Sequence, residues 1–173
     1  MRKRTLSWLG IFMVLLLSAG GCSKSKEEAI PPGPYKNLNT STVNVTNGVG
    51  PLKFGMTKKE VLQLLGPPDL ENKEAGSKAM SFYYKNQGIR VGMDPKGRVA
   101  TIILDKNFRG KTIHGVGIGS RKEDVLKAYG KPTQTRQMFN VEVLEYHQIG
   151  KGGVSFFIKN GKVHEIIIGG IVR

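Results

Sequence analysis

The feature that most constrains this chain is an internal repeat, because two separate stretches of sequence recur at one spacing. LKFGMTKKEVLQLLGPP (52–68) aligns without gaps with VGIGSRKEDVLKAYGKP (116–132), 64 residues further on. GRVATII (97–103) matches GKVHEII (161–167) at the same spacing. Two blocks that agree at one offset indicate two copies of one structural unit.

Each copy begins with the pattern of a short amphipathic helix. The segments TKKE (57–60) and SRKE (120–123) both have the S/T-x-x-E form of a capping box. In that motif the hydroxyl accepts a free N–H of the first turn, and the glutamate reaches back to the cap residue. Gly66 and Gly130 follow the apolar residues and predict the helix ends, where a left-handed backbone favours glycine.

Alternating apolar residues after each helix predict antiparallel strands joined by tight turns. The predicted strands are 80–84, 89–93 and 99–104 in the first copy, and 139–146, 154–158 and 162–168 in the second. The predicted fold class is therefore α+β: two tandem repeats, each a short helix followed by a three-stranded antiparallel β-meander, packed together. We place repeat 1 at 48–110 and repeat 2 at 111–173; they share either an interface or one continuous sheet.

The N-terminal residues have the three-part organisation of an export signal. A basic start, MRKR, precedes an uncharged apolar run from Leu6 to Leu17, and small residues lead to Cys22. The run is too short for a comfortable membrane span, which needs about 20 residues. We interpret 1–21 as a signal peptide and 22–47, rich in Ser, Thr, Asn, Pro and Lys, as a flexible tether.

Cys22 is the only cysteine of the chain, so no intramolecular disulfide can form. SAGGC (18–22) resembles the bacterial lipobox, although Ala19 stands where leucine is usual. The alternative is an ordinary secretory cleavage site. Lipidation of Cys22 would anchor the protein outside the cytoplasm. The anchor would lie in the outer membrane, facing the periplasm, in a host with two membranes, and otherwise on the outer face of the cell membrane.

The charge balance restricts the class of partner. The net charge is +14, and each of the segments 48–110 and 111–173 carries +5. An evenly spread basic excess favours anionic surfaces such as lipid headgroups, an envelope polymer or an acidic protein. Nucleic acid is an improbable partner for an exported protein, and a basic surface without a specific partner is the simplest alternative.

The repeated pattern, an apolar segment ending in Gly, the helix TKKEVLQLLGPP and a meander ending in G-x-V-x-x-I, resembles the SmpA/OmlA (BamE-like) family of small lipoproteins. It is also similar to the tandem-repeat β-lactamase inhibitor proteins, which carry two such units. The resemblance covers about 50–169 and implies a binding or scaffolding protein of the cell envelope rather than an enzyme. The β-lactamase inhibitor proteins contain disulfides, which this chain lacks.

The residues that carry catalytic chemistry do not form a recognisable motif. GVGIGS (115–120) has Ser120 where a dinucleotide-binding loop requires its third glycine, so we predict no cofactor. The three histidines have no metal-ligand spacing, and no serine lies in a G-x-S-x-G context. We predict no catalytic residues. The alternative, a small envelope hydrolase, would depend on His147 and His164 lying close together.

The strand pattern also predicts a binding face. If Met80, Phe82 and Tyr84 point inward, then Tyr83 points outward, and the same alternation turns Arg90 and Phe157 outward. Exposed aromatic and arginine side chains are typical of protein interfaces. The alternative is that Tyr83 and Phe157 are buried between the two copies. The expected function is a lipid-anchored protein that binds an envelope protein.

Overall fold

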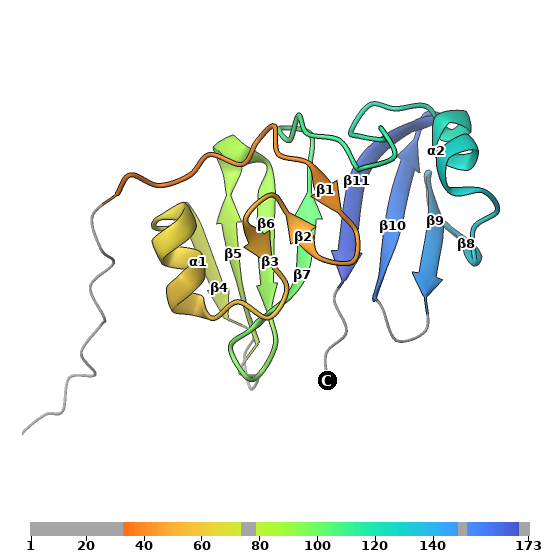
Figure 1. Ribbon diagram of the computed structural model, residues 1–173. Helices are drawn as coiled ribbons and strands as arrows, with labels where there is room; N and C mark the ends of the chain where they lie inside the picture. The colour runs from red at the N-terminus through yellow and green to blue at the C-terminus, as the bar shows by residue number, and fades with distance from the viewer. Residues whose placement is uncertain (1–32, 74–78, 149–151, 170–173) are drawn as a thin grey trace, which may run out of the picture.

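The computed structural model describes residues 33–73, 79–148 and 152–169 (Figure 1). The structure is mostly β, with an eight-stranded antiparallel sheet, a three-stranded sheet, two short α-helices and one 3-10 helix, η1 (Lys85–Gln87), in these residues. The predicted signal peptide, Cys22 and the first part of the predicted tether lie outside the described residues.

The large sheet runs continuously through both halves of the sequence. Its strands, in spatial order, are β4 (Leu70–Lys73), β5 (Met80–Tyr84), β6 (Ile89–Met93), β7 (Val99–Leu104), β11 (Lys162–Gly169), β10 (Gly152–Lys159), β9 (Val141–Gln148) and β8 (Gln134–Met138). The pairing of β7 with β11 joins the halves at the centre, where Ile102 stands opposite Ile168. Figure 1 shows this junction in the middle of the molecule.

The predicted fold class is therefore wrong. The chain does not form two packed α+β units that each consist of a helix and a three-stranded meander; it forms one mainly β structure with a continuous eight-stranded sheet. The sequence pattern missed β4 and β8, which occupy the two edges of that sheet. Every residue of these two strands is exposed, so neither strand has the apolar alternation by which a half-buried strand is recognised.

The first helix follows its sequence signals. α1 (Lys58–Leu65) begins after Thr57, whose hydroxyl accepts the Glu60 backbone N–H, while the Glu60 carboxylate accepts the Thr57 N–H at 2.7 Å. α1 ends at Gly66, where φ is 79°. These contacts form the predicted capping box.

The second helix begins one residue later than SRKE predicts. α2 (Lys122–Tyr129) has Arg121 as its N-cap, and the Asp124 carboxylate accepts the Arg121 backbone N–H at 3.0 Å. Ser120 instead accepts a backbone N–H within the preceding turn, from Gly117 at 3.0 Å. The 64-residue spacing places Arg121, rather than Ser120, opposite Thr57, so the repeat spacing locates the cap better than the local motif does.

A second, three-stranded sheet is built from β1 (Val43–Asn44), β2 (Gly48–Val49) and β3 (Leu52–Lys53). The N–H of Val43 donates to the carbonyl of Lys111, and the carbonyl of Val43 accepts the Ile113 N–H. This small sheet is thereby attached to the segment that links the two halves. The fold begins before the predicted boundary at residue 48, because Leu38 and Val43 of the predicted tether are buried.

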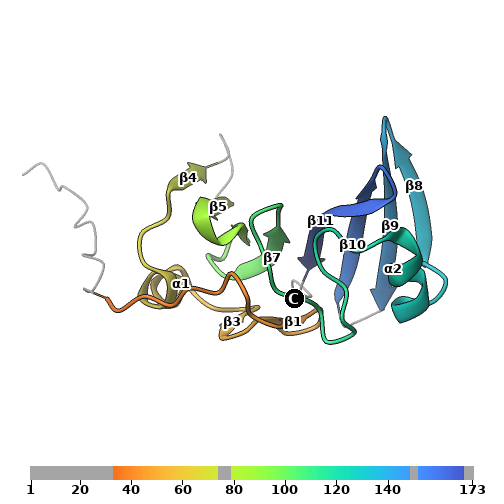
Figure 2. The same ribbon diagram turned by 90° about the horizontal axis from the view of Figure 1, so that it is seen from above.

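The helices and the small sheet cover one face of the large sheet, and the hydrophobic core lies between the layers (Figure 2). One cluster of buried residues includes Phe82 and Ile102 from the first half and Phe156 and Ile168 from the second. The opposite face of the large sheet carries neither a helix nor the small sheet among the described residues. This asymmetry leaves one side of the sheet available for contacts.

Candidate functional site

The open face is the set of side chains on the large sheet that point away from α1, α2 and the small sheet. Directly paired residues of antiparallel strands point to the same face, so the register defines its members. They include Leu70, Ser81, Tyr83, Arg90, Thr101, Ile103, Met138, Val141, Val143, Glu145, His147, Ser155, Phe157, Lys159, Lys162, Glu165 and Ile167.

Tyr83 and Arg90 form a stacked pair at the centre of the first half of the open face. They stand opposite each other on β5 and β6, and the Arg90 guanidinium carbon lies 5.2 Å from the centroid of the Tyr83 ring. The Tyr83 hydroxyl donates to Asp105 at 2.6 Å, and this hydrogen bond, together with burial, raises the pKa of Tyr83. Asp105 therefore fixes the ring on which exposed Arg90 rests.

Phe157 also lies on the open face, but in the second half of the sheet. It stands between Val143 of β9 and Glu165 of β11 and is half-buried. The structure brings Tyr83 and Arg90 into contact, while β7 and β11 separate Phe157 from them. Because the halves join edge to edge through one sheet, Tyr83 and Phe157 are not enclosed between two packed repeats.

A charged cluster, which sequence reasoning missed, occupies the β8 side of the open face. The Glu145 carboxylate is buried, with 4% of the residue exposed, and pairs with the Arg136 guanidinium and with His147 Nε2 at 3.3 Å. Gly153 stands opposite His147, and a Cβ at that position would collide with the imidazole. The Glu-x-His spacing could have indicated that Glu145 and His147 share a face, but β8, which carries Arg136, had no recognisable pattern.

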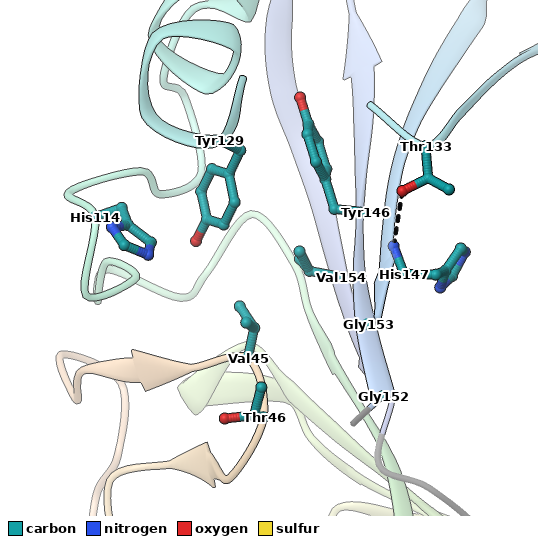
Figure 3. A pocket seen from close by; sticks show the side chains of 10 residues that line it. All are labelled: Val45, Thr46, His114, Tyr129, Thr133, Tyr146, His147, Gly152, Gly153 and Val154. Carbon is teal, nitrogen blue, oxygen red and sulfur yellow. Dashed lines mark hydrogen bonds between the residues drawn. The ribbon is translucent and has the colours of Figure 1, made fainter. Parts of the chain in front are cut away.

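A cavity of about 250 Å³ lies on the other side of the sheet, between α2, the small sheet and the ends of β9 and β10 (Figure 3). Its lining residues are Val45, Thr46, His114, Tyr129, Thr133, Tyr146, His147, Gly152, Gly153 and Val154. Figure 3 shows the Tyr129 and Tyr146 rings near one another, with the His147 ring turned away from both. The ring centroids of the two tyrosines are 5.3 Å apart.

The Tyr129 hydroxyl is a buried polar group without a hydrogen bond among the described residues. The nearby Thr112 hydroxyl acts to lower the pKa of Tyr129, but the two hydroxyls do not have the geometry of a hydrogen bond. Burial is the larger effect and raises the pKa of Tyr129, so the phenol is a protonated donor at neutral pH. An unpaired hydrogen-bond donor beside a cavity could bind a ligand that offers an uncharged or anionic acceptor.

The histidine pair on which the hydrolase alternative depends is not assembled. His147 lies opposite Gly153 near one end of β10, whereas His164 lies near the opposite end, beside the irregularity between Phe157 and Ile158. His114 instead packs edge-on against Tyr129, with their ring centroids 5.0 Å apart. The positions of the histidines give no support to the envelope-hydrolase alternative.

The described residues contain neither a metal-binding cluster nor a membrane-spanning helix. Across 33–73, 79–148 and 152–169, no group of three or more His, Cys, Asp or Glu side chains is arranged to hold a metal ion. Within the same part of the chain, no helix has the length and apolar character needed to cross a membrane.

Comparison with known proteins identifies structural neighbours only. No known family profile and no curated protein sequence matches the chain. Among solved structures, an extracellular protein containing an SCP domain from Bacillus anthracis Ames is 10% identical, with a TM-score of 0.51 over 84% of this chain and 49% of the other. This likeness concerns the fold alone, and the chain spans about half the length of that protein.

A second neighbour is the DUF4309 family protein YjgB from Bacillus subtilis 168. It is 15% identical, with a TM-score of 0.49 over 77% of this chain and 93% of the other. Neither neighbour is described as a member of the SmpA/OmlA family or as a β-lactamase inhibitor protein. The resemblance to those families stays a prediction from sequence.

Proposed function

We propose that this chain is an exported, lipid-anchored envelope protein that binds a partner protein through the open face of its large sheet. The observation that carries the proposal is the one-sided covering of the sheet. Both helices and the small sheet lie on one side, while the other side presents the Tyr83–Arg90 pair among half-buried Ile103 and Ile167.

The chemistry of this face favours a protein with an acidic side chain at the contact. The Arg90 guanidinium is exposed and already held over the Tyr83 ring, so little side-chain freedom is lost when a carboxylate binds it. The surrounding apolar residues provide the area from which water is displaced, and aromatic and arginine residues often dominate such interfaces.

Photocrosslinking in cells tests the open face. A photoreactive residue at Ser81, on the open face, is expected to capture a discrete protein, whereas one at exposed Gln63 of α1 is not. Arg90→Glu should weaken capture at least about tenfold, because it reverses the charge at the contact. Arg109→Glu, which alters another exposed arginine, is the matched control. Equal adducts from Ser81 and Gln63, or none from Ser81, would contradict the proposal.

An anionic envelope polymer is the runner-up as partner, because 48–110 and 111–173 each carry a net charge of +5, which attracts polyanions. Binding of a polymer through distributed charge weakens steeply as the salt concentration rises. Binding through a packed interface at Tyr83 is instead weakened mainly by Tyr83→Ala. A pull-down that is lost at high salt and unaffected by Tyr83→Ala would favour the polymer.

The extracytoplasmic location and the lipid anchor rest on residues 1–22. The export signal fits an extracytoplasmic location, and the Bacillus anthracis neighbour is described as extracellular. Lipidation of Cys22 is tested by Cys22→Ala in the full chain, which should move the protein from the membrane fraction to the soluble extracytoplasmic fraction and change its processing. Unchanged processing and membrane association would exclude the anchor.

A further inference from the structure

The tip of the β8–β9 hairpin has an unusual residue for its position. Met138 pairs with Val141, so Phe139 and Asn140 form a two-residue turn. Phe139 has φ of 50°, in the left-handed region that favours glycine and asparagine and is unfavourable for a bulky side chain. Its side chain is fully exposed, at 101%, so none of the described residues packs against it to compensate for the strained backbone.

The local structure does not explain this phenylalanine. The Phe139 backbone carbonyl accepts a hydrogen bond from Gln137 Nε2 at 2.9 Å, and any residue could supply that carbonyl. Met138 beside it is also exposed, at 48%. A strained backbone combined with a fully exposed apolar side chain indicates that Phe139 serves a contact with another molecule.

The neighbouring hairpin places two lysines behind this apolar tip. Lys159 stands opposite Val141, and Lys162 stands opposite Lys159, so both lysines share the open face with Met138. Both are exposed and form no salt bridge with the described residues. Figure 2 shows the β8–β9 hairpin projecting beyond the β10–β11 turn. From the apex of the hairpin inward, the apolar side chains therefore come first and the two lysines follow.

We propose that this tip is a membrane contact, in which Phe139 and Met138 enter the boundary region of an anionic lipid bilayer while Lys159 and Lys162 bind its headgroup phosphates. Apolar side chains at the hydrocarbon boundary, with lysines extending along their stems to the headgroups, match the layered polarity of a bilayer surface. The net charge of +5 carried by 111–173, the half that contains the tip, is complementary to such a surface.

The shape of the tip favours a bilayer over a protein. A stable protein interface buries about 800 Å² on each partner and surrounds its anchors with further contacts. Here one exposed apolar residue lies in a two-residue turn and the other ends the strand before it, which makes a small convex feature. Lipids are fluid and can close around such a feature. The inference is independent of the partner proposed for Tyr83 and Arg90.

Tryptophan fluorescence provides a direct test. Trp8 is the only tryptophan in the sequence and lies in the predicted signal peptide, whose apolar run would itself enter a bilayer. The chain from residue 22 onward, carrying Cys22→Ala and Phe139→Trp, therefore reports on the tip without that run or a lipid anchor. With phosphatidylcholine–phosphatidylglycerol vesicles, the emission should shift to the blue and be quenched by brominated acyl chains. Neutralising both lysines, as Lys159→Gln with Lys162→Gln, should raise the lipid concentration for half-maximal quenching about tenfold or more.

Two controls separate tip insertion from other association with vesicles. Leu70→Trp, at an exposed position on the opposite edge strand, should stay unquenched when it replaces Phe139→Trp in the same chain from residue 22 onward. Phe139→Gly should relieve the strain and leave the fold unchanged by circular dichroism. The inference is overturned if the tryptophan introduced by Phe139→Trp is unquenched on anionic vesicles, if quenching is equal on pure phosphatidylcholine, or if a photocrosslinker at position 139 captures a protein rather than lipid.

Discussion

Tyr129 differs from Tyr84 and Tyr146 in the state of its hydroxyl. Tyr84 donates to the carbonyl of Gly66 at 3.1 Å, and Tyr146 donates to that of Gly130 at 3.0 Å, so each fastens a strand to the end of a helix. Tyr129 faces the cavity and makes no such bond among the described residues. At the level of single residues, the Tyr129 hydroxyl is thus a buried hydrogen-bond donor that the described residues leave unpaired.

Tyr129→Phe is expected to stabilise the isolated protein, because removing an unpaired buried hydroxyl removes its desolvation cost while keeping the ring contacts with Tyr146 and Phe156. The free energy of unfolding in urea should rise by up to about 1 kcal/mol. Tyr146→Phe is the matched control, and it should lower stability because it breaks the bond to Gly130. Destabilisation by Tyr129→Phe would mean that the hydroxyl has a partner.

At the scale of the elements, the helix caps show how far a local motif determines structure. Thr57 and Glu60 satisfy each other's backbone amides at α1, as TKKE predicts. At α2, Asp124 and Arg121 replace the predicted serine cap. The interior strands of the large sheet were also predictable, since β5 and β6 have alternating buried residues. The edge strands were not, because their pairing with β5 and β9 is set by the sheet rather than by their own pattern.

Thr57→Ala should lower the free energy of unfolding by about 1 kcal/mol, the usual cost of removing a helix N-cap. The α1 N-terminus would lose the acceptor for the Glu60 N–H. Thr57→Ser keeps the hydroxyl and should retain most of the stability. Chemical denaturation of the three proteins checks the prediction, and equal loss from both substitutions would assign the effect to the lost methyl group instead.

The cap carboxylates should also contribute to acid sensitivity. The Thr57 backbone N–H, followed by its hydroxyl, lowers the pKa of Glu60 below its ordinary value of 4.5. The folded state therefore holds this proton less tightly than the unfolded state. The stability from Glu60 is present above about pH 4.5 and is lost as the pH falls through the folded-state pKa.

Glu60→Gln should accordingly flatten the decline of unfolding free energy between roughly pH 5 and pH 3. The effect is measured by urea titrations at a series of pH values. Asp124→Asn supplies an independent comparison at α2, because hydrogen bonds from the Arg121 side chain and backbone lower the pKa of Asp124. If the pH profile of Glu60→Gln coincides with that of the unmodified chain, the cap contributes nothing to acid unfolding.

At the scale of the whole molecule, one core and one sheet connect the two halves. Ile102 and Ile168 stand opposite each other on β7 and β11, and both are fully buried. The shared cluster of buried residues extends from Phe82 to Phe156. The two halves of the sequence should therefore unfold together, because separating them would expose the centre of the sheet.

Ile168→Ala should lower the free energy of unfolding by about 2–5 kcal/mol and leave a single transition. Far-ultraviolet circular dichroism and tyrosine fluorescence should give coincident curves, since tyrosines occur in both halves. Ile113→Ala, at a residue that is 56% exposed, is the control and should change stability little. Two separated transitions would indicate that each half is a domain in its own right.

The local features of this protein could be predicted from its amino-acid order: the spacing of its two copies, the positions of α1 and α2 and the alternation of its interior strands. These follow from caps, glycines and the two-residue period, which act over a few neighbouring residues. Long-range contacts, in contrast, cause β7 to pair with β11, residues 38–53 to complete the core and the polar edge segments to become strands. Those outcomes depend on hydrogen bonds and burial between distant segments, so no local pattern specifies them.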